Sequence, residues 1–177
     1  MYKSEIAKVR HLIMPYCLCN SVIDYGFGGD KICPWAIGID LEKPYANTGG
    51  DAIQLVNEDN DSANLPWFKD ESIDVIVSSH LLEDFDNKIE VMKEWTRVLK
   101  VGGHLALYLP DEQCYRKYCF LHNQGSNTAH KDENFSKEKL KKYAEQLGNL
   151  KVMLETDIIM DYSFAIVFRK TKAIVGE

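Results

Sequence analysis

The sequence of 177 residues lacks any apolar stretch near the roughly 20 residues that a membrane-spanning helix needs, so we expect no membrane segment. It also lacks a surplus of basic residues. Its formal net charge of −6 argues against a general binder of nucleic-acid backbones, because such binding depends on clustered Lys and Arg. Repeats and linkers are absent as well. With 45% hydrophobic and 27% charged residues, residues 1–177 are expected to form one globular domain. The first residues carry charges and run into a helical pattern instead of a signal peptide, so the expected location is cytoplasmic.

The five cysteines do not show the spacing of a metal site or of a disulfide framework. Their number is odd, and no two have the Cys-x-x-Cys spacing of a zinc site. Cys17 and Cys19 alternate, so they would point to opposite faces of an extended segment. We therefore expect reduced thiols in a reducing compartment, and no metal.

Apolar patterns along the chain alternate between the period of a strand and that of a helix. About twenty-five residues after Pro110 show neither pattern, and we expect a functional or mobile loop there. The fold class expected is α/β: a Rossmann-like, mostly parallel, seven-stranded sheet with a C-terminal antiparallel hairpin. The expected strands cover residues 21–24, 36–39, 53–56, 73–77, 105–109, 151–155 and 163–168, and the expected helices cover 6–13, 87–100 and 136–147.

A glycine-rich turn separates the first two expected strands. The first apolar run opens into Tyr25-Gly26-Phe27-Gly28-Gly29, and the second ends at Asp40, eleven residues after Gly29. Parallel α/β sheets hold adenosine ligands in this way, with glycines after the first strand and a carboxylate after the second. The pattern therefore predicts an adenosine-binding site.

The short link between this turn and the second strand narrows the choice of ligand. Only Asp30 to Trp35 lie in it, which leaves room for a shortened first crossover helix of a single turn. Nicotinamide dehydrogenases instead use a full helix to bind the pyrophosphate. A nucleotide-dependent oxidoreductase is therefore disfavoured, and a ligand with a ribose but no phosphate is favoured.

Five segments, in this order, resemble the motifs of class I S-adenosylmethionine-dependent methyltransferases. They are Asp24 to Gly28, Asp40, Asp61 to Pro66, Asp74 with Ser78 to Glu83, and Leu99 to Gly103. The last glycine of the first motif is displaced to Gly29, and Val101 stands where the family has proline.

The resemblance implies that the cofactor is S-adenosylmethionine. It implies that Asp40 accepts hydrogen bonds from both ribose hydroxyls, that Asp61 takes the adenine amino group and that Ser62 offers backbone contacts. The implied cofactor-binding residues are Asp24, Gly26, Phe27, Gly28, Gly29, Asp40, Leu41, Asp61, Ser62, Ser78 and Ser79.

A resemblance to one group within this family implies the class of methyl acceptor. The short first link, Pro66-Trp67-Phe68 and Tyr162-Ser163-Phe164 resemble compact bacterial methyltransferases that accompany glycosyltransferases, which implies a small hydroxylated acceptor such as a sugar or glycan precursor. Nucleic-acid amino methyltransferases carry an Asn- or Asp-Pro-Pro-aromatic turn after the fourth strand. Ser78-Ser79-His80-Leu81 contains no such turn, so no nucleic-acid partner is expected.

Three titratable side chains near strand ends are candidates for the catalytic base or for acceptor ligands. They are His80 after the fourth strand, Asp111 after the fifth and His130 in the polar loop. Each has a structural alternative: a helix cap for His80, a turn former for Asp111 and a solvated position for His130. The alternative function is a non-catalytic methyltransferase-like module that binds the cofactor or a partner. An exposed last strand could also pair across a homodimer.

Overall fold

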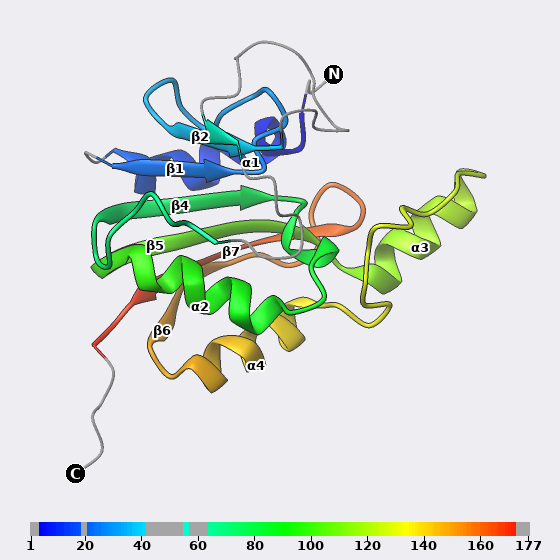
Figure 1. The fold of residues 1–177 in the computed structure, drawn as a ribbon. Coiled ribbons are helices and arrows are strands. Elements are labelled where there is room, and N and C mark those ends of the chain that lie inside the picture. Colours follow the sequence, from blue (N-terminus) through cyan, green and yellow to red (C-terminus); the bar gives the residue numbers. More distant parts are fainter. Residues whose placement is uncertain (1–3, 19–20, 42–54, 57–63, 173–177) are drawn as a thin grey trace.

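The computed structural model describes residues 4–18, 21–41, 55–56 and 64–172, which form a mixed sheet with helices on both faces (Figure 1). The order of the strands in the sheet is β3-β2-β1-β4-β5-β7-β6. The strands are β1 Val22–Tyr25, β2 Ile37–Asp40, β3 Leu55–Val56, β4 Ile73–Ser79, β5 Leu99–Pro110, β6 Leu150–Glu155 and β7 Ser163–Lys170. The helices are α1 Glu5–Ile13, α2 Lys88–Val98, α3 Glu112–Leu121 and α4 Lys137–Leu147, and the 3₁₀ turns are η1 Met14–Cys17 and η2 Leu82–Asp84.

The directions of the strands divide the sheet into a parallel and an antiparallel part. β3, β2, β1, β4 and β5 pair in parallel, whereas β7 lies antiparallel to both β5 and β6. The expected α/β sheet with a C-terminal antiparallel pair is therefore present. Six of these strands have at least four residues, and the expected third strand is reduced to the two described residues Leu55 and Val56. The carboxyl ends of the parallel strands point to the same end of the sheet, beyond which α3 projects (Figure 1).

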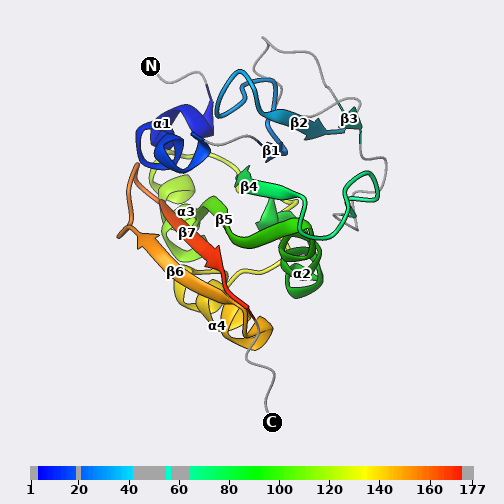
Figure 2. The ribbon, with the colours of Figure 1, turned by 90° about the vertical axis from the view of Figure 1, so that its left-hand side faces the viewer.

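Helices bury both faces of the sheet, which explains the continuous apolar run of β4. Side chains alternate between the faces of a strand, so Ile76 belongs to one core cluster, whereas Val75 and Val77 belong to the other. α1 lies on one side of the sheet, and α2 and α4 lie on the other (Figure 2). The buried side chains that the α-helices contribute to the two clusters are Ile6, Val9 and Ile13 of α1, Val91, Met92, Trp95 and Val98 of α2, and Leu140 and Ala144 of α4.

The crossover from β1 to β2 differs from the expected shortened helix. Residues 26–36 form turns and bends without a helix, so that prediction is wrong. Gly26, Gly28 and Gly29 all have positive φ angles, of 73°, 57° and 85°, and such angles interrupt a right-handed helix. Pro34 then restricts the few residues that remain.

α1 supports this crossover from outside. The Arg10 guanidinium donates to the Ile32 carbonyl oxygen at 3.1 Å and to the Lys31 carbonyl oxygen at 2.9 Å, and it pairs with Asp30 at 2.8 Å. The Ser4 hydroxyl also donates to Asp30. The helix before β1 therefore satisfies loop carbonyl groups that lack a helix of their own.

Two other segments differ from the sequence-based expectation. α3 begins at Glu112, inside the stretch expected to be a loop, and Asp111 caps it. β5 begins at Leu99, so Gly102 and Gly103 lie inside a strand and do not end the preceding helix. A Cβ on Gly103 would lie 2.7 Å from the Asp74 carbonyl oxygen, so this glycine allows β5 to approach β4 closely.

Among the described residues, four cysteines form no disulfide, namely Cys17, Cys33, Cys114 and Cys119; Cys19 lies outside the described residues. Among the described helices, none combines the length and the apolar character required to cross a membrane.

Candidate active site

The glycine turn lies at the carboxyl ends of β1 and β2. The Gly26 amide donates to the Ile39 carbonyl oxygen at 2.7 Å, which fixes the start of the turn against β2. At this position φ is 73°, and an added Cβ would lie 2.6 Å from Cδ2 of Leu81, which follows β4. Only glycine therefore fits both the backbone conformation and the space between the turn and the end of β4.

Asp40, at the end of β2, faces this turn. Its Oδ2 accepts from the Gly28 amide at 2.7 Å, and its Oδ1 accepts from the Leu41 amide at 2.8 Å. Partial burial raises the pKa of the Asp40 carboxyl, and the two amides oppose that rise. A carboxylate offers about four acceptor positions, so each oxygen can take a further hydroxyl proton. Asp40 is thus both tied to the glycine turn and able to bind a ribose.

Asp24 and Phe27 contribute to the shape of the turn. Asp24 is 1% exposed, and its Oδ2 accepts from the Ile32 amide at 2.6 Å. Burial raises the pKa of Asp24 to about 7. Phe27 is buried against β2, where a Cβ on Gly38 would lie 2.6 Å from Cε1 of the ring. Asp24 closes the crossover, and Phe27 packs in the interior.

Two serines end β4 beside the turn. Ser78 pairs in register with Tyr25 of β1 and Leu107 of β5. The hydroxyl oxygens of Ser78 and Ser79 are buried and have no hydrogen-bond partner among the described residues, nor has Oδ1 of Asp24. Buried polar atoms are normally satisfied, so these three indicate a ligand at the carboxyl ends of β1 and β4. The predicted Asp61 and Ser62 lie outside the described residues.

His80 follows directly, at the point where the chain leaves β4. Its φ is 50°, and its amide donates to the Tyr108 carbonyl oxygen at 2.8 Å. Nε2 lies 3.1 Å from Oγ of Ser163 and 3.3 Å from Oε2 of Glu5. Burial lowers the pKa of His80 to about 4, so the ring is neutral at pH 7 and can accept a proton. The side chain caps neither η2 nor α2.

His130 is brought to the same end of the sheet by the segment between α3 and α4. Its side chain is 5% exposed, so the solvated alternative is wrong. Nδ1 makes a hydrogen bond with Glu112, and the ring packs against Tyr115 with centroids 4.9 Å apart. Nε2 lies 3.8 Å from Oε1 of Glu83 and 4.0 Å from Oδ1 of Asp84.

Glu83 joins the two histidines and was not predicted from the sequence. Its side chain is 1% exposed, and Oε1 lies 3.7 Å from Nδ1 of His80 and 3.8 Å from Nε2 of His130. Burial, followed by the charges of Asp84 and Glu112, raises its pKa well above the usual value. Its place three residues after His80 could have indicated the contact, but glutamates in a turn are usually exposed.

Asp111 has a structural part in this arrangement. Its Oδ1 accepts from the Cys114 amide at 3.1 Å, which caps α3, and its own amide donates to the Tyr162 carbonyl oxygen at 2.8 Å. No hydrogen bond or ion pair joins its carboxylate to His80 or His130 in the described part of the chain. The structure thus brings the two predicted histidines together but leaves Asp111 as a helix cap.

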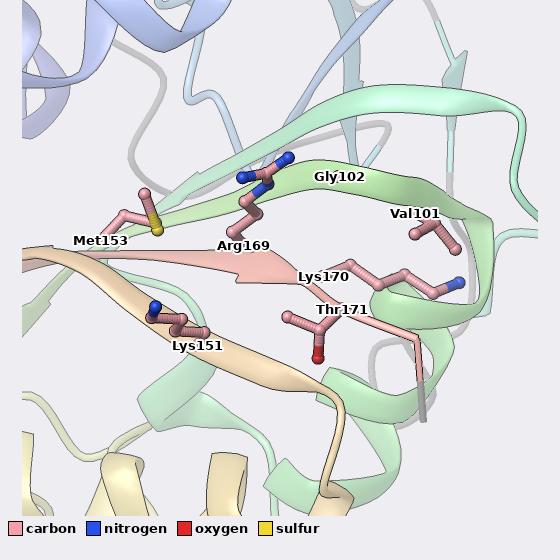
Figure 3. Close-up of a pocket in the computed structure, with 7 residues that line it drawn as sticks. All are labelled: Val101, Gly102, Lys151, Met153, Arg169, Lys170 and Thr171. Carbon is pink, nitrogen blue, oxygen red and sulfur yellow. The ribbon is translucent and has the colours of Figure 1, made fainter. Parts of the chain in front are cut away.

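A separate hollow lies at the opposite end of the sheet, where β5 begins and β7 ends (Figure 3). Lys170 reaches the Leu99 carbonyl oxygen at 2.8 Å and Glu71 at 3.3 Å. None of the predicted site residues lines this hollow, so it is distinct from the site at the carboxyl ends. Its lining residues are Val101, Gly102, Lys151, Met153, Arg169, Lys170 and Thr171.

Comparisons with known proteins agree with this geometry. Residues 23–107 match a protein-family model described as a methyltransferase domain. A comparison with curated proteins gave no match. Similar solved structures include a Pyrococcus horikoshii protein, at 17% identity over 94% of this chain and 89% of that chain, with a TM-score of 0.71. A SAM-dependent methyltransferase from Archaeoglobus fulgidus has 18% identity over 93% and 92%, with a TM-score of 0.70. Another from Mesorhizobium loti has 15% identity over 94% and 98%, with a TM-score of 0.69.

The glycine turn and Asp40 lie at the carboxyl ends of the parallel strands β1 and β2, where parallel α/β sheets hold adenosine ligands. The matched methyltransferase domain covers residues 23–107, and the similar solved structures share this fold. They do not favour the alternative of a non-catalytic module. The glycine turn, Asp40 and the unsatisfied hydroxyls of Ser78 and Ser79 fit S-adenosylmethionine.

Proposed function

We propose that the protein methylates a small hydroxylated acceptor held at the carboxyl ends of β4 and β5. A sugar or glycan precursor is the acceptor class proposed, on the sequence resemblance to compact bacterial members. The bound cofactor supplies a methyl group that its sulfonium already activates. The chain then has three tasks: to align the acceptor oxygen with that methyl group, to exclude water and to take one proton.

In this proposal, the residues around the glycine turn bind the cofactor. The positive φ angles at Gly26, Gly28 and Gly29 let the backbone approach the ligand closely. The free acceptor positions of Asp40 bind the ribose hydroxyls, and the buried hydroxyls of Ser78 and Ser79 gain the partners that they lack within the described chain.

His80 is the proposed proton acceptor, and its neutral ring at the end of β4 is the observation that carries this part of the proposal. Burial keeps the pKa of His80 near 4, so the ring is unprotonated at neutral pH. An acceptor oxygen becomes strongly acidic as it bonds to the methyl carbon, because its lone pair is drawn into the new bond. A weakly basic imidazole can therefore take the proton late in the attack.

The test is turnover with chemically defined acceptors. The protein is incubated with S-adenosylmethionine and a panel of monosaccharides, methyl glycosides and sugar nucleotides, and mass spectrometry detects S-adenosylhomocysteine and an O-methylated product. We expect His80→Gln to lower kcat by about 100-fold, at the lower end of the range for acid–base catalysis, while S-adenosylhomocysteine still binds. His11→Gln, on the exposed side of α1, is the matched control. Methyl transfer to amines but to no hydroxylated compound would overturn the acceptor class.

A further inference from the structure

The carboxylate of Glu83 lies between two imidazoles that come from different segments of the chain. Oε1 is 3.7 Å from Nδ1 of His80 and 3.8 Å from Nε2 of His130. Neither carboxylate oxygen has a hydrogen-bond partner within the described residues, although the side chain is 1% exposed. The Lys131 amide donates to the Glu83 carbonyl oxygen at 3.1 Å, which holds the segment of His130 against the turn after β4.

The row of titratable groups continues from His130 toward the surface. Nδ1 of His130 makes a hydrogen bond with the buried Glu112, whose other oxygen lies 3.3 Å from Nε of Arg116. The Arg116 side chain is 38% exposed and pairs at 3.3 Å with Glu133, whose side chain is 75% exposed. Titratable groups thus form a row from the end of β4, through the segment before α4, to the outer surface of α3.

Other charges face this row from each element packed against it. Asp84 in η2 and Glu112 in α3 oppose ionisation of Glu83, whereas Lys88 in α2 favours it. From α1, Glu5 raises the pKa of His80 and Lys8 lowers it, although burial is the largest influence on that pKa. The carboxyl of Glu83 is therefore surrounded by charges of both signs without a direct partner.

We propose that Glu83 is a positioning residue, which holds His80 with its proton on Nδ1 and passes that proton toward His130. The proposal rests on the proposed function. With the proton on Nδ1, Nε2 carries a lone pair that the Ser163 hydroxyl contacts at 3.1 Å and that takes the acceptor's proton when the acceptor replaces this hydroxyl. Glu5, at 3.3 Å, favours the protonated ring. One proton then enters at Nε2 while one leaves from Nδ1 to Glu83, whose proton moves to Nε2 of His130 as His130 gives its Nδ1 proton to Glu112. No electrons are exchanged: His80, Glu83 and His130 each take and give one proton, and Glu112 takes the last one.

The contact distances set what motion this step needs. The gaps of 3.7 and 3.8 Å exceed the length of a hydrogen bond, so the Glu83 carboxyl must approach each imidazole in turn. No side chain of another described residue makes a hydrogen bond to the carboxylate, so rotation of this side chain breaks none to a neighbouring side chain. A buried carboxyl kept only for stability would be costly, since it is desolvated without compensation.

The first experiment tests the row without any acceptor. The ¹⁵N shifts of the His80 and His130 rings are followed against pH in the full chain, with and without S-adenosylhomocysteine. We expect each ring to report the same set of macroscopic titration steps as the other, because the steps of coupled groups belong to the set and not to one residue. Glu83→Gln should remove this coupling and Glu83→Asp should keep it. Independent titration of the two rings, unchanged in Glu83→Gln, would overturn the proposal.

The second experiment measures turnover with the acceptor that reacts fastest in the panel above. Glu83→Gln should lower kcat by about 100-fold with KM unchanged, and Glu83→Asp should restore part of the loss. Glu90→Gln, a side chain 69% exposed on α2, is the matched control and should retain the wild-type kcat. A Glu83→Gln variant with wild-type kcat and pH profile would refute the positioning role. If wild-type protein methylates no hydroxylated compound, the proposed function fails, and the ¹⁵N titration still decides on the row.

Discussion

The buried carboxyl of Asp24 predicts that the protein becomes less stable as the pH rises toward neutrality. Burial is the main cause that raises its pKa from 3.8 to about 7, and the charges of Asp30 and Asp40 add to the rise. The hydrogen bond from the Ile32 amide and the charge of Arg10 oppose it without cancelling it. The substitution Asp24→Asn tests this carboxyl alone, because asparagine has nearly the same size as aspartate but does not titrate.

The size of the stability loss follows from the difference between the pKa of Asp24 in the folded protein and its pKa in the unfolded chain. The folded protein binds the Asp24 proton more tightly than the unfolded chain does, so the stabilising contribution of the protonated carboxyl is complete below pH 3.8 and is lost as the pH rises through about 7. Each unit corresponds to about 1.4 kcal/mol, so the total loss is about 4 kcal/mol. Between pH 5 and pH 8, the expected loss is about 3 kcal/mol.

Urea unfolding of wild type and Asp24→Asn at pH 5 and pH 8 measures this loss. The free energy of unfolding of wild type, relative to the variant, should fall by about 3 kcal/mol between the two pH values. Asp86→Asn, at an exposed position before α2, controls for the loss of one negative charge. A relative change below about 1 kcal/mol would refute the assignment of a raised pKa to Asp24.

Three further predictions concern the turn, its support and the base. Gly26→Ala should abolish calorimetric binding of S-adenosylhomocysteine, because its Cβ would lie 2.6 Å from Leu81, whereas Gly125→Ala meets nothing within 4 Å and should bind normally. Arg10→Lys should lower the free energy of unfolding in urea by about 1 kcal/mol, since lysine cannot reproduce the fork that holds the crossover; equal stability would contradict this. Because the pKa of His80 is about 4, kcat should show no step near pH 6.5, and a step there would contradict His80 as the base.

Local chemistry made several elements predictable from the sequence. The Ser136 hydroxyl accepts from the Lys139 amide and Gly148 takes a φ of 70°, so the expected cap and stop do define α4. β4 was predictable because a strand buried on both faces is apolar at nearly every position. The glycine turn was predictable because few residues other than glycine adopt the positive φ angles that it needs. Asp40 was predictable from its place at the end of the second apolar run.

The proposed acceptor side, around His80 and His130, could not be predicted in the same way, because its buried groups are polar. α3 has only Glu112 and Cys119 buried, so it shows no apolar stripe by which a helix would be predicted. Glu83 and Glu112 are buried by contacts between segments far apart in the chain, and their residue type suggests exposure. His130 was a candidate base or acceptor ligand, and the solvated position weighed against that role is wrong because its side chain is 5% exposed.

α1 contacts both the crossover between β1 and β2 and the proposed base His80. Eleven residues between β1 and β2 are too few for a helix that would pack on the sheet, and Arg10 satisfies carbonyl groups of this loop from outside. On the same helix, Oε2 of Glu5 lies 3.3 Å from Nε2 of His80, and the Lys8 ammonium lies 5.9 Å from the centre of the Tyr162 ring. One helix therefore supports the cofactor turn and contacts the proposed base. The missing crossover helix does not by itself argue against catalysis, because α1 supplies the support that such a helix would give.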